Sequence, residues 1–495
     1  MAAAAREVQP VGQSADLCAL LGPRRRTQAD PRRLDLHLRR ADPALHADGA
    51  VLARAGLDRP AGAGRLSHPG LGRDHLGLPA GRAGHPRRGA DQGGLAGQAR
   101  AHGRMMRLAG LLLALICTAA GAAAQSPPAP GSIRIASFNT ALAQKGAGLL
   151  VRLLEEGGNR QVDGIARIIL SVRPDILLVQ EFDHDMEGRA LDAFAGILAA
   201  GRAGLAGIAY PHRLAWPVNT GERSGLDLDG DGRDYTAADA FGFGAFPGQY
   251  GMAVLSRLPL MAAESRSFRL LRWAEFPGAR LPMRADGTPF PSAEAQAAMR
   301  LSSKSHWDLR VALPGGGRLA LFVSHPTPPV FDDEHDLNGR RNADEIAFWQ
   351  LYIEGEPFTD DTGAIAPRAD IPFVVMGDLN SDPDDGDSIH EAIRALLSHP
   401  LLQDPRPASP GAVAAAQDAV NRAQKGDPAL DTGDFREKKG PGNLRVDYVL
   451  PARSLKVTGA GVFWPAPGAP LHELVAGGVR TSSDHRLVWV DIALP

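Results

Sequence analysis

The sequence predicts an α/β fold of the α+β sandwich kind instead of a doubly wound sheet. Three observations predict it. Short apolar runs of strand length recur along the chain and are bounded by turn residues. Segments with apolar residues at helical spacing separate some of these runs. Strands and helices do not alternate strictly, which favours a sandwich over a doubly wound parallel sheet.

Seven strands are expected, at 133–138, 176–179, 252–255, 319–323, 373–376, 446–450 and 487–492. The clearest helix covers "DGIARIILSVRP" (163–174), where apolar residues recur at helical spacing before a terminating proline. Further helices are expected at 343–353 and 388–397. Surface insertions in a single domain are expected in the polar or Gly- and Pro-rich connections at 217–249, 274–298, 355–370 and 402–444.

The first 104 residues differ in composition from the rest of the chain. They contain no Phe, Trp, Tyr, Ile, Lys or Asn. Such a segment cannot bury enough apolar surface to offset the entropy that ordering costs. It is predicted to be a disordered extension or, preferably, an upstream region translated from a mis-set start codon.

Residues 105–124 have the pattern of a secretory signal peptide. One arginine precedes a short apolar core, and three alanines form a small-residue cleavage site that ends at Ala124. The core is too short for a membrane anchor, and the bulky residue before Cys117 disfavours processing as a lipoprotein. We therefore expect residues 125–495 as a secreted or periplasmic protein without a transmembrane segment.

Cleavage after Ala124 would change the charge and remove the thiols. The first 124 residues hold 18 Lys and Arg and 9 Asp and Glu, which leaves 36 and 47, and a net charge of −11, for residues 125–495. Cys18 and Cys117 both lie upstream, so this part cannot form a disulfide. An acidic protein binds polyanions poorly, so its charge does not indicate a nucleic acid partner. A monomer is expected.

Polar side chains stand at the ends of the expected strands. The candidates are Asn139, Glu181, His325, Asp378, Asn380, Asp447, Asp484 and His485. Each of them alone is more often a satisfied turn residue than a functional one. Together they combine hard oxygen ligands with two histidines, as Mg²⁺ chemistry on a phosphate ester requires.

A separate acidic stretch, "GLDLDGDGRD", follows a different pattern. Asp227, Asp229 and Asp231 alternate, and Gly232 occupies the sharp-turn position, as in the first half of a calcium loop. The twelfth position is Ala238 instead of a bidentate glutamate. The stretch is therefore predicted to be a partial, structural Ca²⁺ site, with an acidic turn as the alternative.

Seven stretches along the chain match one family in the family's order. They are "ASFN", "LLVQE", "YGMAVLSRLP", "FVSHPTP", "MGDLNSDP", "VDYVLP" and "SSDHRLVWVDI", and they cover about residues 131 to 495. With them the chain resembles the endonuclease/exonuclease/phosphatase superfamily. The resemblance implies the four-layer DNase I-like fold, in which two mixed β-sheets pack face to face and are flanked by helices. It also implies a hydrolase of phosphate esters that uses Mg²⁺ or Mn²⁺.

The resemblance also implies roles for the metal-binding and basic residues. Glu181 would bind the metal, and Asn139 beside it would be a second ligand or a phosphate contact. Asp378 would orient the nucleophile or hold a second metal. His485 would be the general base that deprotonates the attacking water, oriented by Asp484, which is also a candidate metal ligand.

The remaining roles concern the transition state and the second histidine. The resemblance implies that Asn380 stabilises the pentacoordinate phosphorus, that His325 donates to a phosphate oxygen, and that Asp447 pairs with a catalytic histidine or contacts metal. Neighbouring side chains diverge in a regular strand. Asp484 therefore either lies in a turn or contacts His325 instead of His485.

The sequence indicates less clearly which basic residues would contact phosphate. Members of the family often carry an arginine in this region, and here "RLSSKSHWDL" offers Arg300 and Lys304 as candidates. The stretch "NGRRN" (338–342) is either a basic pocket or a solvated helix start.

The sequence therefore predicts a secreted, divalent-metal-dependent phosphoesterase. Nucleases, sphingomyelinase-like phospholipases and phosphatases share the fold, and the fold does not choose among them. A rival hypothesis is an exported binding module that keeps the fold without catalysis.

Overall fold

The structure, a computed structural model, describes residues 125–331, 334–435 and 440–494. The predicted extension at 1–104 and the predicted signal peptide at 105–124 lie outside the described residues. Within the described part, no helix combines the length and the apolar character that crossing a membrane requires.

One half of the fold is a mixed six-stranded sheet. Its strands are β1 (Ser132–Asn139), β2 (Ile176–Gln180), β3 (His212–Leu214), β4 (Met252–Ser256), β14 (Val457–Val462) and β15 (Val488–Ala493). Their order is β14-β15-β1-β2-β4-β3. The central strands β1 and β2 run parallel, with Asn139 opposite Gln180. The residues that follow these two strands therefore emerge at the same edge of the sheet.

The other half is a mixed five-stranded sheet. Its strands are β5 (Arg266–Ser267), β6 (His306–Ala312), β7 (Arg318–Ser324), β10 (Phe373–Asp378) and β13 (Asp447–Pro451). Their order is β13-β10-β7-β6-β5. β7 and β10 run parallel, whereas β10 and β13 are antiparallel, with Asp378 opposite Asp447. The two sheets contact each other through β1 and β2 on one side and β10 and β13 on the other.

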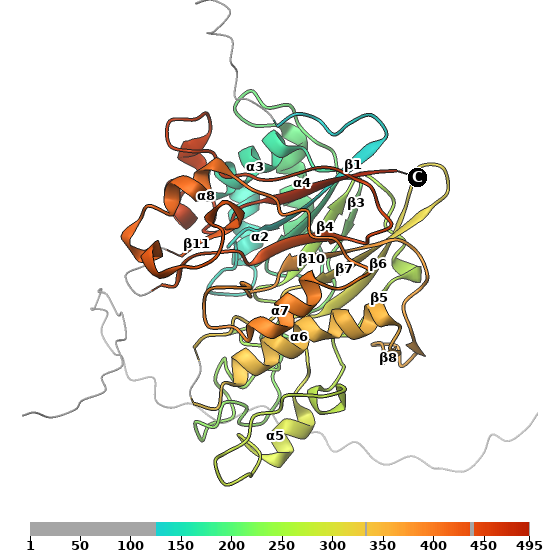
Figure 1. The fold of residues 1–495 in the computed structure, drawn as a ribbon, viewed down its shortest axis with the longest axis vertical. Coiled ribbons are helices and arrows are strands. Elements are labelled where there is room, and N and C mark those ends of the chain that lie inside the picture. Colours follow the sequence, from blue (N-terminus) through green and yellow to red (C-terminus); the bar gives the residue numbers. More distant parts are fainter. Residues whose placement is uncertain (1–124, 332–333, 436–439, 495) are drawn as a thin grey trace, which may run out of the picture. The chain divides into compact units, whose positions relative to one another are not determined.

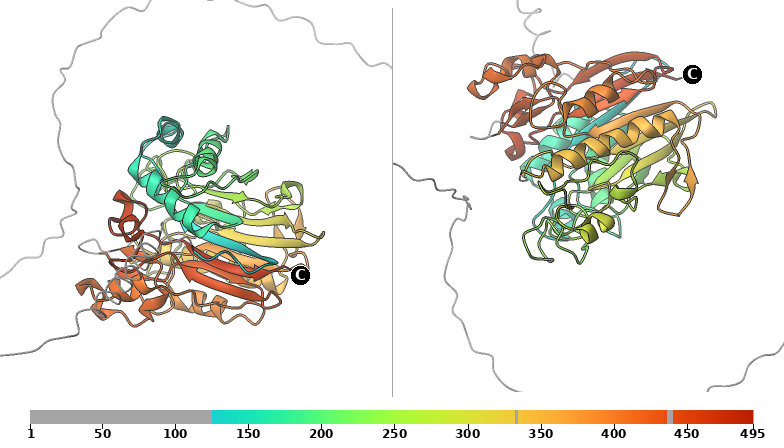
Figure 2. Two further views of the ribbon diagram at one scale, coloured as in Figure 1. Left: turned by 90° about the horizontal axis from the view of Figure 1, so that it is seen from above. Right: turned by 60° about the horizontal axis from the view of Figure 1, so that its bottom comes forward.

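Helices cover the outer faces of both sheets (Figures 1 and 2). α2 (Leu149–Glu156), α3 (Arg160–Val172) and α4 (Arg189–Ala200) lie on the six-stranded sheet, and α6 (Leu337–Glu354) and α7 (His390–Leu397) lie on the five-stranded sheet. Arg134 of β1 donates to the last carbonyl of α3 at 2.7 Å. Phe322 of β7 stacks on Trp349 of α6 with ring centroids 5.1 Å apart. The predicted four-layer sandwich is confirmed.

All seven predicted strands and all three predicted helices are present. β6 has no apolar run in its sequence and was therefore not predicted. Its sequence HWDLRVA carries three polar side chains that are nevertheless buried. Two of them are satisfied inside the sheet, where Asp308 accepts from Arg310 and, at 2.7 Å, from the hydroxyl of Tyr352. A buried strand can therefore lack the apolar pattern when its polar groups have partners.

The insertions hold the remaining regular elements, which are α5 (Ala293–Ala298), β8 (Phe358–Thr359), β9 (Ile365–Ala366), α8 (Pro410–Ala415), β11 (Gly433–Phe435) and β12 (Gly442–Leu444). The interpretation of 402–444 as a surface insertion is wrong for its last part. Thr432 is fully buried, and its hydroxyl accepts from the main-chain N–H groups of Val446 and Asp447 at 3.0 and 2.9 Å. This segment therefore supports the start of β13.

Candidate active site

The polar strand ends of the two sheets meet at one edge of the sandwich. β1 ends at Asn139, and Glu181 follows β2 directly. In the facing sheet, β10 ends at Asp378 and β13 begins at Asp447. Glu181 has a φ of 51°, which is uncommon for a residue other than glycine. Such strained positions cluster at functional sites.

Asn139 links the two sheets at this edge. Its side-chain Nδ2 donates to Oε1 of Glu181 at 3.1 Å and to Oδ2 of Asp378 at 2.9 Å. Its main-chain carbonyl accepts from the hydroxyl of Ser483 at 2.7 Å. Because a neutral amide carries two donors, Asn139 can stand between two carboxylates without adding charge. It thereby fixes the distance between Glu181 and Asp378.

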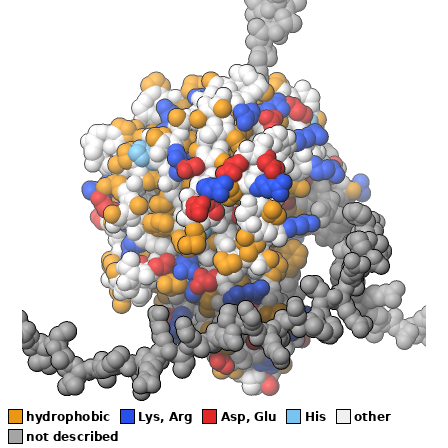
Figure 3. Space-filling view, turned by 180° about the vertical axis from the view of Figure 1, so that it is seen from behind, with side chains coloured by type: hydrophobic (Ala, Val, Ile, Leu, Met, Phe, Trp, Pro, Cys, Tyr) orange, Lys and Arg blue, Asp and Glu red, His pale blue; other side chains and the backbone are white. Residues whose placement is uncertain are grey.

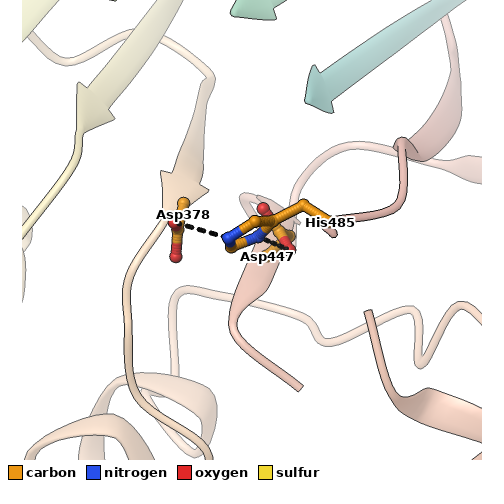
Figure 4. A group of neighbouring side chains, drawn as sticks. All are labelled: Asp378, Asp447 and His485. Carbon is orange, nitrogen blue, oxygen red and sulfur yellow. Dashed lines mark hydrogen bonds and ion pairs between the residues drawn. The ribbon is translucent and has the colours of Figure 1, made fainter. Parts of the chain in front are cut away.

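His485 lies between two carboxylates, as Figure 4 shows. Its Nδ1 is 2.9 Å from Oδ2 of Asp447, and its Nε2 is 3.6 Å from Oδ2 of Asp378. Burial lowers the pKa of His485, but the negative charges of Asp447 and Asp378 outweigh burial and hold this pKa well above its usual value. Asp447 thus fixes the ring, and Nε2 faces the centre of the site.

His325 approaches the site from the end of β7. Its Nε2 lies 3.4 Å from Oδ2 of Asp378. Burial, together with the charges of Lys304 and His485, lowers the pKa of His325 well below its usual value, which favours the neutral imidazole. Burial raises the pKa of Asp378 to about 6, against the opposing charge of His485. The pKa values of the two histidines are therefore shifted in opposite directions.

Glu181 and Asp484 bring further negative charge to the same place. Burial raises the pKa of Glu181, and the neighbouring charges of Asp484 and Asp378 raise it further. Buried carboxylates that repel one another are the donor set that a divalent cation satisfies. Asp378, Asp447 and His485 also offer ligand atoms within 4.8 Å of one another, and Oδ1 of Asp447 is buried without a hydrogen-bond partner among the described residues. The residues present therefore fit a metal ion.

The role assigned to Asp484 is corrected by this geometry. The residue that contacts Nδ1 of His485 is Asp447, and the structure gives no contact between Asp484 and His325. Asp484 lies in the connection before β15, where its carbonyl accepts from the N–H of Asp434 at 2.8 Å. The negative charge of its carboxylate raises the pKa of Glu181, so Asp484 stays a candidate metal ligand.

Of the two candidate phosphate contacts, one lies beside the site and the other does not. Arg300 donates to Asn219 at 2.6 Å and to Glu222 at 2.9 Å, so its guanidinium is engaged in the 217–249 insertion. Lys304 is buried close to Glu181 and Asp378, whose charges act on it, and burial lowers its pKa. The structure places Lys304 beside the predicted site residues and engages Arg300 elsewhere, and the role of each as a phosphate contact stays a prediction.

Asn380 and Ser483 shape the loops around the site. Asn380, at a φ of 51°, donates from its N–H to Asp378 at 2.9 Å and from its side chain to the carbonyl of Pro326 at 3.1 Å. Ser483 accepts from the N–H of His485 at 3.0 Å while it donates to Asn139. Sequence reasoning missed Ser483 and Thr432. The pair of serines before Asp484 was a signal for the first, and nothing in the sequence marked the second.

The acidic stretch 225–234 forms a turn with a different ligand set from the one predicted. Asp227, Asp229 and Asp239 have carboxylate oxygens within 4.8 Å of one another. Asp231 instead pairs with Arg233. Asp239 is therefore a further candidate ligand, and the predicted role of Asp231, which pairs with Arg233 in this structure, stays a prediction.

A sandwich of two mixed sheets with carboxylates, an amide and histidines at one edge defines a protein of the DNase I-like class. The chain belongs to the Endonuclease/Exonuclease/phosphatase family, whose model matches residues 136–485. Members of this family are hydrolases that act on phosphate esters and depend on divalent metals. No curated protein sequence matches the chain.

Solved structures of this family resemble the chain at low identity. An endonuclease/exonuclease/phosphatase from Beutenbergia cavernae is 19% identical over 73% of this chain and 72% of its own, with a TM-score of 0.42. The human nocturnin catalytic domain with bound sulfate anion is 16% identical over 74% and 94%, with a TM-score of 0.37. A mannosyl-6-phosphatase from Bacteroides thetaiotaomicron is 13% identical over 73% and 100%, with a TM-score of 0.38.

Proposed function

We propose that this protein is a phosphoesterase that depends on Mg²⁺ or Mn²⁺ and hydrolyses a phosphodiester or a phosphomonoester by in-line attack of water. One observation carries the proposal. Asp447 holds His485 by Nδ1 at 2.9 Å, so that Nε2 lies 3.4 Å from Nδ2 of Asn139 and 3.6 Å from Asp378. An imidazole oriented in this way is equipped to take a proton from water.

The metal would be held by Glu181 and Asp484, with Asp378 as a further ligand, and Asn139, which presents its Nδ2 to Glu181 and Asp378, would orient these carboxylates. When bound, a divalent cation neutralises phosphate charge, and its positive charge lowers the raised pKa of His485 so that Nε2 is free to accept a proton. Hard oxygen donors of this kind are those that Mg²⁺ and Mn²⁺ prefer.

The other steps belong to the side chains. His485 removes the proton from the attacking water, and Asp447 stabilises the imidazolium that results. Neutral His325 supplies a hydrogen-bond donor, and Lys304 supplies positive charge, for the non-bridging phosphate oxygens. Asn380 contributes its side-chain amide to the developing charge.

The charge of the protein favours a small or lipid phosphate ester over a long nucleic acid. Residues 125–495 have a net charge of −11, and the face in Figure 3 shows acidic and basic side chains interspersed. A long polyanion is bound mainly by arrays of cations that neutralise its phosphates. Sphingomyelinase-like phospholipase activity and nuclease activity are therefore the two alternatives that a substrate panel must separate.

The decisive experiment is hydrolysis of DNA, sphingomyelin, a chromogenic phosphodiester and a chromogenic phosphomonoester, each with Mg²⁺ or with EDTA. We expect turnover of at least one substrate that EDTA abolishes. His485→Ala should lower kcat by about 10²–10⁴-fold, because that is what loss of a general base costs. Glu181→Gln should raise the Mg²⁺ concentration needed for half activity.

Glu187→Gln serves as the control, since Glu187 is an exposed acid in the loop that follows β2. Its Mg²⁺ dependence should equal that of the wild type. If the folded wild type cleaves none of the substrates but binds one of them, the protein is a binding module and the proposal is wrong. Full turnover by His485→Ala would instead remove this residue from the role of base.

A further inference from the structure

The N-terminal half of α6 buries polar side chains that the proposed reaction does not use. Arg341, Asn342, Asp344 and Glu345 are all buried, although α6 lies on the outer face of a sheet. Charged side chains are seldom buried unless they have partners. The stretch "NGRRN" is therefore neither a basic pocket nor a solvated helix start, as Arg341 donates to main-chain carbonyls, among them Leu301 at 3.0 Å.

Glu345 is the residue of this group whose contacts lead to the active site. Its Oε1 accepts from the N–H of Ser303 at 2.7 Å and from the hydroxyl of Ser303 at 3.1 Å. Its Oε2 accepts from the N–H of Thr327 at 2.6 Å. Ser303 directly precedes Lys304, and Thr327 follows His325 by two residues. One buried carboxylate therefore holds the main chain beside both groups.

The same two segments lead into β6 and β7, whose ladder begins at the pair His306 and Ser324, and the side chains of Ser303 and Lys304 add two further contacts. Nζ of Lys304 makes one hydrogen bond within the described residues, to the carbonyl of Pro326 at 3.4 Å. The hydroxyl of Ser303 lies 3.5 Å from the carbonyl of His325, at the limit of a hydrogen bond. Both contacts are long, whereas those of Glu345 are short and charge-assisted. Beyond the β6–β7 ladder, which pairs His306 with Ser324, Glu345 is thus the link with the shortest hydrogen bonds between the two segments.

Asn342 adds a second link of the same kind one turn earlier on the helix. Its side-chain Nδ2 donates to the carbonyl of Thr327 at 2.8 Å and to the carbonyl of Leu379 at 3.0 Å. Leu379 lies between Asp378 and Asn380. The inner face of α6 therefore contacts the main chain beside three predicted catalytic side chains, and it touches none of them directly.

We propose that Glu345 is a positioning residue that sets Lys304 and His325 at the spacing needed to bind one phosphate group together. It acts through the N–H groups of Ser303 and Thr327 and does not contact substrate. The inference rests on the proposed function, because it assigns Lys304 and His325 to the phosphate. It adds a residue on α6, outside the strand ends, to the set that determines activity.

The test is a double-mutant cycle on a substrate that the wild type cleaves, with the variants Glu345→Gln, Lys304→Met and their combination. Glutamine has the shape of glutamate but only one acceptor oxygen, so it cannot accept from both N–H groups. We expect Glu345→Gln to lower kcat/KM by about 10- to 100-fold, as misplaced catalytic groups do. The Mg²⁺ concentration for half activity should stay that of the wild type, because Glu345 does not touch the metal-binding residues.

The double variant distinguishes a positioning role of Glu345 from a general effect of the substitution on stability. If Glu345 acts through Lys304, the loss in the double variant should fall short of the product of the two single losses by at least about fivefold. Losses that simply multiply, or a Glu345→Gln variant within twofold of the wild type, would overturn the inference. Glu354→Gln, at the exposed end of the same helix, is the control and should change nothing.

Two further readouts keep the outcome clear. Glu345→Asp keeps both acceptor oxygens on a shorter side chain and should recover part of the activity that Glu345→Gln loses. If Glu345→Gln does not fold, as circular dichroism and a melting curve would reveal, the same cycle is run with Glu345→Asp. A wild type that cleaves no substrate contradicts the proposed function, whereas an active wild type with additive variants contradicts only the role of Glu345.

Discussion

The carboxylate that orients His485 comes from the neighbouring strand and not from the neighbouring residue. Asp484 precedes His485 in the sequence, but Asp447, 38 positions away, lies 2.9 Å from its Nδ1. The main chain of Asp447 is held in turn by the hydroxyl of Thr432. The two aspartates should therefore affect different kinetic parameters.

Asp447→Asn should lower kcat by at least about 10²-fold, because an asparagine can neither stabilise the imidazolium nor fix its tautomer. Asp484→Asn should instead raise the Mg²⁺ concentration for half activity and leave kcat at saturating Mg²⁺ nearly unchanged. Steady-state kinetics over a Mg²⁺ titration measure both quantities. A larger fall in kcat for Asp484→Asn than for Asp447→Asn would contradict the assignment.

Individual site residues differ in how well the sequence predicts them. Asn139, Glu181 and Asp378 end or follow buried strands, and a strand that stops at a polar residue is visible in sequence. The pairing of Asp447 with His485 depends on the register that puts Asp447 opposite Asp378, which no local pattern reveals. Arg300 and Lys304 are both cations that precede β6, and the sequence does not distinguish them. The structure does, because Arg300 donates to the acceptors Asn219 and Glu222.

At the scale of elements, the acidic turn at 225–234 differs from the calcium-loop pattern in the position of its last acidic residue. A calcium loop places its last ligand at the twelfth position, which is Ala238 here, and the chain supplies Asp239 instead. Asp239 is fully buried and accepts from the N–H of Leu228 at 3.1 Å, so the end of the turn folds back over its beginning. Calcium binding by this turn stays a prediction.

If the turn binds Ca²⁺, then Ca²⁺ should raise the melting temperature at constant Mg²⁺, since a ligand at 100 times its Kd stabilises the folded state by about 2.7 kcal/mol. Asp229→Ala should abolish the shift. Asp231→Ala should retain it, because Asp231 pairs with Arg233. Differential scanning calorimetry with and without Ca²⁺ measures the shift, and an unchanged shift in Asp229→Ala would exclude this turn.

The elements themselves were predictable to the extent that their buried faces were apolar. α3 places isoleucines on one face, and its bounds follow from Asn159, which caps its start by accepting from the N–H of Val162, and from Pro174 beyond its end. In α6 the buried face includes Arg341 and Glu345, so helical spacing alone would place these residues in solvent. β6 was missed for the same reason.

At the scale of the whole molecule, export is the prediction that concerns the part of the chain outside the described residues. The pattern at 105–124 predicts cleavage after Ala124. Protein exported from its host should therefore begin at or near Gln125, and N-terminal sequencing of that protein is the measurement. An exported chain that begins at Met1, or anywhere in the first hundred residues, would contradict the prediction.

The sandwich itself was predictable because a doubly wound parallel sheet needs strict alternation of strands and helices, which the sequence lacks. The order of the strands was not. β1 lies between β2, its successor, and β15, the last strand of the chain, and pairing across so long a separation leaves no local trace. The five-stranded sheet is likewise completed by β13, which returns after the long 402–444 insertion.

The hydrogen bonds of Asn139 have a consequence for how the candidate site is assembled when the chain folds. Glu181 belongs to one sheet and Asp378 to the other, and a single amide spans the seam between them. Both sheets are therefore needed to form the candidate site, because its carboxylates come from different sheets. A substitution between the sheets that moves Glu181 away from Asp378 would therefore disrupt the candidate site even where the hydrogen bonds within each sheet are kept.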